Sequence, residues 1–285
     1  MKYECHGHIA ADGADYRLAM ARHEGGASEV AVRAELAKLR EHGVTYFRDG
    51  GDRVGASALA KSLAPEYGIE YRTPIFITYK RGGYGGMYGR AFDDMRGYRA
   101  LVREAAELGA DFVKLTASGM LDFAGDGSVM GGEMPTDELR EMVRAAHGEG
   151  FAVMTHVSGA DNIKRAIDAG TDSVEHGFWA DEAAIRAMSD AGTIWTPTCA
   201  PVTNLLGKSD DPRFCDATLR RIWDAHSAML RYAYGLNVAL ASGSDSGAYG
   251  VPHGRGTDDE YAALATLGID PARGNAAVRE RFARR

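Results

Sequence analysis

The sequence has little cysteine and no long apolar stretch. Only Cys5, Cys199 and Cys215 occur among 285 residues. This small, odd number argues against a disulfide framework and favours a reducing compartment. No run reaches the roughly eighteen apolar residues that a membrane-crossing helix needs, and no signal-type apolar core follows Met1. We therefore expect a cytoplasmic protein with no membrane partner.

Positive charge is also scarce. The chain has 33 Lys and Arg against 40 Asp and Glu, for a net charge of −7. Nucleic-acid-binding proteins need a basic surface, so we expect no nucleic-acid partner. No Walker-type phosphate loop occurs, and the glycines near residue 85 lack the strand-to-helix context of a dinucleotide-binding fingerprint. We therefore expect neither a nucleic-acid partner nor a bound dinucleotide.

The overall composition is that of a globular protein. Hydrophobic residues make up 45% of the chain and charged residues 26%, and the length allows a sizeable core. A single unit of this length is usual for barrels of alternating strands and helices. Because no linker or low-complexity tract interrupts the chain, we expect one domain over residues 1–285.

A repeat of a helix-like segment, a glycine and a strand-like run occurs seven times. Glycine is the residue with which helices commonly end in the left-handed conformation. The segments between the runs have helical spacing of apolar residues, as at Val32, Leu36 and Leu39. The strand-like runs are residues 2–9, which open the chain, and then 44–47, 69–78, 111–115, 151–155, 173–175, 193–198 and 236–241. Eight strands alternating with helices predict an α/β fold, and a closed (β/α)8 TIM barrel rather than an open doubly wound sheet.

Six side chains that can bind metal lie at the ends of strand-like runs. A barrel brings the carboxyl ends of its strands together at one mouth. Alternate residues of a strand point to the same side, so a His-x-His pair can hold one ion. A lone histidine is more often a hydrogen-bonded core residue, but the joint placement favours a metal site. The six candidates are His6, His8, Lys114, His156, His176 and Asp245.

Lys114 is the unusual member of this set. A lysine ammonium among imidazoles would repel a metal ion, so this side chain must be displaced or chemically altered if the site is real. Carboxylation by carbon dioxide would turn the amine into an anion with two oxygens, able to bridge two metals. The alternative is a lysine that reaches from the strand end to solvent.

Taken in order, these residues resemble the amidohydrolase superfamily, and within it the imidazolonepropionase-like and Xaa-Pro dipeptidase-like branch. The resemblance implies His6, His8 and Asp245 on one metal, His156 and His176 on a second, and carboxylated Lys114 with a hydroxide between them. It runs through His6-Gly7-His8, Arg48-Asp49-Gly50-Gly51, Phe112-Val113-Lys114-Leu115, Thr155-His156-Val157-Ser158-Gly159, Val174-Glu175-His176-Gly177, Gly243-Ser244-Asp245-Ser246-Gly247 and Pro252-His253-Gly254. The resemblance implies two zinc ions as the cofactor, although imidazole also suits other divalent transition metals.

The implied activity is hydrolysis of an amide, peptide-like or cyclic amide bond in a small carboxylate-bearing molecule. The bridging hydroxide would attack the carbonyl, with Asp245 and His176 as candidate catalytic residues and Asp245 as the proton acceptor. Deaminase and lactonase chemistry fall within the same class. Two other functions stay open: a decarboxylase, which is a lyase of the same superfamily, and a catalytically silent metal-binding barrel.

Four residues are candidates for substrate contacts. The loop at residues 79–90 carries tyrosines and arginines that could clamp a carboxylate, or it is a solvated mobile loop. His253 either contacts the substrate or holds the last loop in place. Phe178-Trp179 departs from the small and tyrosyl residues common in relatives. The candidates are Arg48, Tyr79, Trp179 and His253.

Three further expectations concern the rest of the chain. Glu4 stands where the family usually has Asp, and we expect it to keep the same role. Relatives usually add a small β-sandwich built from sequence before the first strand and after the last helix, whereas this chain starts within a few residues of His6 and ends soon after Arg273. We therefore expect a bare barrel, which would self-associate as a homo-oligomer to cover apolar surface. The other histidines, at positions 23, 42, 147 and 226, are expected at the surface.

Overall fold

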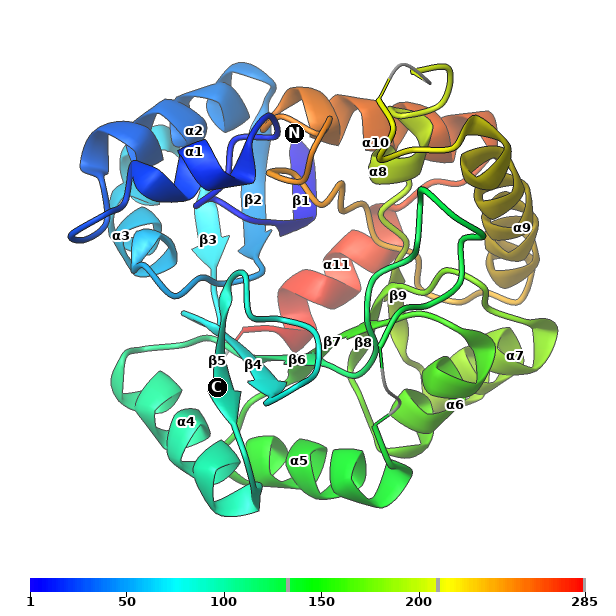
Figure 1. Ribbon diagram of the computed structural model, residues 1–285, viewed down its shortest axis with the longest axis horizontal. Helices are drawn as coiled ribbons and strands as arrows, with labels where there is room; N and C mark the ends of the chain where they lie inside the picture. Colours follow the sequence, from blue (N-terminus) through cyan, green and yellow to red (C-terminus); the bar gives the residue numbers. More distant parts are fainter. Residues whose placement is uncertain (132–133, 209–210, 284–285) are drawn as a thin grey trace.

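The computed structural model describes residues 1–131, 134–208 and 211–283, and its strands curve around a central axis (Figure 1). All neighbouring strands run parallel. The first sheet has the order β1 (Lys2–Gly7), β2 (Val44–Asp49), β3 (Glu70–Arg72). The second has the order β5 (Gly89–Phe92), β4 (Ile77–Lys80), β6 (Val113–Thr116), β7 (Val153–Val157), β8 (Ser173–His176), β9 (Ile194–Thr196).

The eighth position of the barrel is held by backbone pairing without a regular strand. Trp195 of β9 donates its N–H to Ala239 O and accepts from Ala241 N, both at 2.9 Å. One residue further on, Ser242 O accepts from Cys5 N of β1 at 2.8 Å. The run predicted at 236–241 therefore lies where the barrel needs its last strand, and the predicted TIM barrel is confirmed.

The third predicted strand, at 69–78, is divided into two. Its first part, β3, pairs with β2, and its second part, β4, pairs with β6. Pro74 lies between them and has no N–H for a strand ladder. Beyond β4 the predicted loop at 80–90 ends in an additional strand, β5, which pairs with β4.

Helices surround the barrel, as predicted from the apolar spacing between strands (Figure 1). In α2, for example, the side chain of Ser28 caps the first turn and Val32, Leu36 and Leu39 are buried. None of the helices in the described ranges has the length and apolar character needed to cross a bilayer. The helical segments are α1 (Tyr16–Ala21), α2 (Glu29–Glu41), α3 (Ala56–Leu63), η1 (Ala64–Tyr67, a 3-10 helix), α4 (Met95–Glu107), α5 (Thr136–Gly148), α6 (Ala160–Asp168), α7 (Glu182–Ala191), α8 (Ala200–Thr203), α9 (Asp216–Gly235), α10 (Arg255–Thr266) and α11 (Ala272–Arg281).

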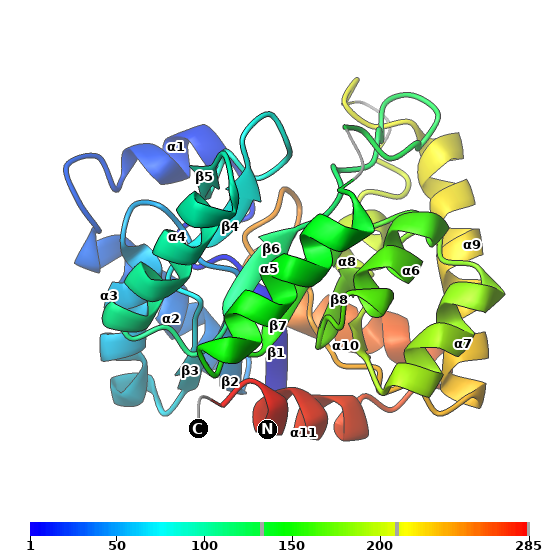
Figure 2. The same ribbon diagram turned by 90° about the horizontal axis from the view of Figure 1, so that it is seen from below.

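The amino end of the barrel, where the strands begin, is closed by α11 (Figure 2). Phe282, directly after this helix, is fully buried and meets Phe112 edge to face, with 5.3 Å between ring centroids. Val278, Tyr46 and Cys5 belong to the same apolar cluster. The carboxyl end of the barrel, where the strands finish, is thus the open one.

Two of the four histidines expected at the surface are buried. His226 is 2% exposed and its Nε2 lies 3.1 Å from the carbonyl oxygen of Pro197, while His23 is 4% exposed and its Nδ1 accepts from Ser28 N at 3.1 Å. The prediction was wrong for both because helix position alone does not show which face meets the core. His42 and His147 are partly exposed, with side-chain exposures of 32% and 43%.

Candidate metal centre

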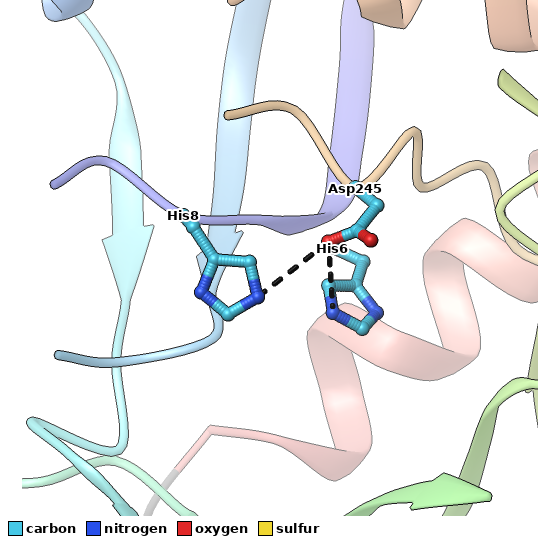
Figure 3. A group of neighbouring side chains, drawn as sticks. All are labelled: His6, His8 and Asp245. Carbon is cyan, nitrogen blue, oxygen red and sulfur yellow. Dashed lines mark ion pairs between the residues drawn. The ribbon is translucent and has the colours of Figure 1, made fainter. Parts of the chain in front are cut away.

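The first donor group comes from the end of β1 and the last loop of the barrel. His6 Nε2 and His8 Nε2 lie 3.6 Å and 3.5 Å from Asp245 Oδ1 (Figure 3). The ligand atoms of the three side chains all lie within 4.8 Å of one another. Gly7 between the histidines packs so tightly that a Cβ there would lie 2.4 Å from Ser246 Oγ. Two imidazoles and a carboxylate at this separation suit a divalent transition metal.

Glu4 holds the loop that carries Asp245. Its buried carboxylate accepts hydrogen bonds from Ser244 N at 2.7 Å and from Thr257 Oγ1 at 2.6 Å. Gly243 allows the loop to approach β1 so closely that a Cβ would lie 2.8 Å from His6 N. Asp245 itself has a left-handed φ of 57°, which non-glycine residues adopt rarely and mainly at functional sites.

A buried ion pair lies directly beneath the donors. Glu175 Oε2 is 2.7 Å from His6 Nδ1, and both Glu175 oxygens accept from Arg48 at 2.9 Å. Since a carboxylate only accepts, His6 Nδ1 carries the proton and Nε2 keeps its lone pair toward Asp245. Glu175 thereby fixes the tautomer that a metal ligand requires. From the sequence, Glu175 stood out only as part of a strand-like run and of a family motif, although an acidic residue within the buried run Ser173–His176 was a usable signal.

The second donor pair comes from the ends of β7 and β8. The rings of His156 and His176 meet edge to face with 4.4 Å between centroids, and His176 lies 4.9 Å from the His6 ring. His176 Nδ1 is 2.8 Å from Thr198 Oγ1, which leaves Nε2 available. His156 Nε2 is 3.3 Å from the carbonyl oxygen of Gly119, which leaves Nδ1. Each ring thus has one nitrogen tied to the protein and one able to bind an ion.

Lys114 lies between the two donor groups. It is 2% exposed, and its Nζ is 3.2 Å from His6 Nε2. Among the described residues, no carboxylate lies within 4.0 Å of this amine. The side chain of Lys114 therefore does not reach solvent, and it lies beside a histidine nitrogen that could bind a metal.

Burial favours the neutral form of every base in the centre. It lowers the pKa of His8 and of His156 to about 3, with the positive charge of Lys114 as the next cause. The pKa values of His6 and His176 are also lowered by burial. Burial likewise lowers the pKa of Lys114 and raises that of Asp245. Neutral imidazoles are the form that binds metals, so the free lone pairs are available near neutral pH.

The centre opens into a cavity of about 890 Å³. All six side chains predicted from strand ends line it. Tyr88 stacks on the His8 ring at 4.7 Å, and Tyr84 packs against His156 at 4.7 Å. Both tyrosines come from the segment between β4 and β5. This tyrosine-bearing loop is the one expected to clamp a carboxylate, but Tyr79, the residue predicted there, is not among the lining residues.

The other three expected substrate contacts also lie away from the cavity lining in the described chain. Arg48 is fully buried under the centre, where it pairs with Glu175. Trp179 Nε1 donates to the carbonyl oxygen of Gly127 at 2.7 Å, and His253 Nε2 lies 3.0 Å from that of Ala11. Arg48 is held by Glu175, and Trp179 and His253 by backbone oxygens, so none of the three lines the cavity and their substrate roles stay predictions. For His253 the contact with Ala11 favours the loop-holding alternative.

Comparison of the sequence with known proteins finds several relatives. An ochratoxinase of Aspergillus niger is 25% identical over 274 residues, which cover 86% of this chain and 57% of that protein. An uncharacterized protein of Mycobacterium tuberculosis is 30% identical over 174 residues, covering 60% of this chain and 45% of that protein. The chain spans about half the length of these two relatives.

Comparison with solved structures finds the same barrel. A Xaa-Pro dipeptidase with bound methionine superposes with a TM-score of 0.79 at 21% identity, over 98% of this chain and 75% of that chain. The structure of the Aspergillus niger ochratoxinase gives a TM-score of 0.74 at 22% identity, over 99% and 69% of the two chains. A family model described as "Amidohydrolase family" matches residues 4–261. With most of its length matched and the expected donors gathered at the carboxyl end of the barrel, the chain belongs to the amidohydrolase family.

Proposed function

We propose that this protein is a binuclear metal-dependent hydrolase of amide bonds. The observation that carries the proposal is the convergence of two donor groups on either side of a buried lysine. His6, His8 and Asp245 would hold one ion, and His156 and His176 the other. The names of the relatives, ochratoxinase and Xaa-Pro dipeptidase, support an enzyme of this class.

The chain's own residues supply the rest of the chemistry. Divalent ions, when bound, would lower the pKa of a coordinated water to about 7 and polarise a substrate carbonyl. Asp245, whose pKa burial raises, is suited to accept a proton near neutral pH and deliver it to the leaving nitrogen. Tyr84 and Tyr88 cover the imidazoles of His156 and His8, which orients the rings and excludes water from them.

Carboxylation of Lys114 completes the proposed centre. The lone pair of neutral Nζ attacks the carbon of carbon dioxide. An N–C bond forms as one C=O π bond opens onto its oxygen, and the nitrogen passes a proton to water to give a carbamate. Burial lowers the pKa of Lys114, which raises the fraction of neutral amine that can react. The product is an anion with two oxygens, which would be able to hold metal ions that the amine would not.

A carboxylate on the substrate could pair with an arginine at the edge of the cavity. Arg17 lines the cavity and is exposed, and no ion pair of its guanidinium lies within 4.0 Å among the described residues. The Arg48 and Tyr79 contacts expected from the sequence are thereby replaced by Arg17. We retain a small carboxylate-bearing amide as the substrate class.

The test combines metal content, mass and turnover of the full chain. Purified protein loaded with zinc should contain two ions per chain by plasma mass spectrometry, and native mass spectrometry should show the mass of one added carbon dioxide. Asp245→Asn should retain its circular dichroism spectrum and lose hydrolysis of N-acyl amino acids. Lys114→Ala should bind less metal and regain some turnover with added short carboxylic acids. A metal content near zero together with no turnover would refute the proposal.

A further inference from the structure

The outer part of the cavity has an apolar wall, which we define as Tyr16, Met87, Met120, Phe123, Met130 and Phe214. The wall comes from four separate segments, which follow β1, β4, β6 and α8. The last two rise together on one side of the barrel mouth (Figure 2). Phe123 and Phe214 lie 6.5 Å apart between ring centroids, and Phe214 stacks on Tyr249 at 5.4 Å. The aromatic surface is therefore continuous across segments distant in sequence.

The wall rests on a small core of its own. Leu121, Phe178, Leu205, Leu219 and Ile222 are buried together, and Phe123 and Phe214 pack against them. Side chains backed by buried neighbours keep their position, so the aromatic part of the wall is preformed. A preformed apolar surface beside a reactive centre is typical of a binding site for an apolar group.

Four side chains at the cavity are unusually exposed for their type. Met87 and Met120 are each 38% exposed, Met130 is 44% and Tyr249 is 43%. All four line the cavity. Isolated exposed apolar residues are ordinary, but a group gathered at one opening marks an interaction site. Methionine suits such a site because its flexible thioether adapts to different apolar shapes.

Charges at the opening do not favour a small, highly charged molecule. Arg213 lines the cavity, but its guanidinium binds both oxygens of Asp211 and stacks over Tyr249 at 4.1 Å. Asp15 and Asp122 also line the cavity. Apart from Lys114 in the metal centre, the described lining thus leaves only Arg17 as an unpaired cation.

We infer that the substrate is an amide joining a carboxylate-bearing part to a large apolar group, either a long acyl chain or a fused aromatic ring system, and that the apolar wall holds this group. The inference rests on the proposed function and specifies its substrate class. A cavity of about 890 Å³ lies near the upper end of the range for drug-sized ligands, roughly 300–1,000 Å³. N-acetyl amino acids and short dipeptides would leave most of the wall unfilled.

The first experiment compares acylglycines on the zinc-loaded full chain. N-decanoylglycine and N-(2-naphthoyl)glycine should be hydrolysed with a kcat/KM at least about 10-fold above that of N-acetylglycine, because added apolar groups fill a matching pocket. A preference for either large group supports the inference and identifies the better shape. Equal or higher kcat/KM for N-acetylglycine overturns it while leaving the hydrolase function standing.

A binding measurement separates this inference from the proposed function. Fluorescence of N-(2-naphthoyl)glycine should report binding to chelator-treated protein, because the wall contains no metal ligand. Binding without any turnover would uphold the wall and refute the hydrolase. No detectable binding, together with no preference in turnover, overturns the inference.

Variants of the wall provide the matched control. The double variant Met87→Ser, Met120→Ser should lower kcat/KM for N-decanoylglycine about 10-fold more than for N-acetylglycine. Val30→Ser removes a side chain that is 82% exposed on α2 and does not line the cavity, so it should change neither. An equal loss for both substrates in the double variant would show a merely structural effect and overturn the assignment.

Discussion

The two ends of the barrel are built from the same strands with opposite chemistry. β1 contributes Cys5 to the apolar cluster at the amino end and His6 to the donors at the carboxyl end. At the amino end Phe112 and Phe282 are fully buried hydrocarbon. At the carboxyl end, four imidazoles, an amine and a carboxylate lie close together as a cluster of polar side chains. The comparison shows that one end stabilises the fold and the other holds polar groups in a costly arrangement.

Arg48 lies at the boundary between these ends. Its guanidinium carbon stands 4.4 Å from the centre of the Phe282 ring, and its terminal nitrogen binds Glu175, which binds His6. The orientation of a metal-type imidazole therefore depends on packing at the closed end. Arg48, which was expected to contact the substrate, instead contacts both the apolar cluster at the closed end and the residue that orients His6.

The largest effect should come from breaking the open end. His156→Asn removes a donor from the second pair, so turnover should fall at least about 1,000-fold while the fold is kept. After chelator treatment, the variant should be as stable as the wild type or more stable, because one of several buried polar groups that lie close together without a metal has been removed. Steady-state kinetics and chemical denaturation measure the two effects. Unchanged turnover would contradict the assignment of the donor pair.

The closed end should respond in the opposite way. Phe282→Ala removes a fully buried ring and should lower the free energy of unfolding by about 3–5 kcal/mol, measured by urea denaturation. Turnover at low temperature should change far less than in His156→Asn. Phe282→Leu is the control and should lose about half as much stability or less. If Phe282→Ala lost activity without losing stability, the closed end would contribute to turnover directly, and the division between the two ends would be wrong.

The contact between Thr198 and His176 tests how the donors are oriented. Thr198→Val removes the hydroxyl that lies 2.8 Å from His176 Nδ1. Zinc affinity should fall about 10–100-fold, as is usual when the hydrogen-bond partner of a metal ligand is removed. Thr198→Ser keeps the hydroxyl and should stay close to the wild type. Competition with a chromophoric chelator measures both, and identical affinities would show that the contact is incidental.

The most gradual expected effect concerns the pH dependence of stability. Burial raises the pKa of Glu260, on α10, to about 8. The folded state then binds a proton that the unfolded state has released above its ordinary pKa of about 4.5. Stability relative to Glu260→Gln should therefore fall as pH rises through this window, by at most about 1.4 kcal/mol per pH unit, and level off above about pH 8. Denaturation at pH 6, 7 and 9 measures it.

A matched comparison comes from the amino end. At Asp172, burial acts in the opposite direction, but hydrogen bonds from His147, Val153 N and Arg281 lower the pKa. Its contribution is present above the unfolded pKa and is lost as pH falls through the folded value. Asp172→Asn should therefore lose stability at neutral pH and not in acid. Parallel pH curves for the Glu260 and Asp172 variants would contradict this difference.

Much of the barrel could be predicted because its signals are local. Glycine after a helix and alternation along a strand depend on neighbouring residues, so seven of the predicted runs appear as strands and the eighth as backbone pairing. The split at Pro74 and the added strand β5 depend on which strands lie beside them. The surface expectation for His226 failed for the same reason, since burial depends on partners distant in sequence.

The set of candidate ligands was also readable before the structure, while the substrate contacts were not. A side chain at the end of a barrel strand has its direction set by the strand, as for His6, His156 and Lys114. A side chain on a loop has its direction set by whichever carbonyl or carboxylate it meets. Trp179 and His253 are both bound to backbone oxygens that no sequence spacing identifies.

By itself, the order of residues determined that this chain alternates strands and helices and that its metal-type side chains stand at strand ends, because both follow from interactions between near neighbours. Only the tertiary structure decided that Glu175 and Arg48 lie beneath those side chains, that α11 closes one end, and that methionines and aromatic rings from separate loops form one wall. Such contacts join residues far apart in the sequence, and the free energy of burial that selects them exists only once the chain has folded.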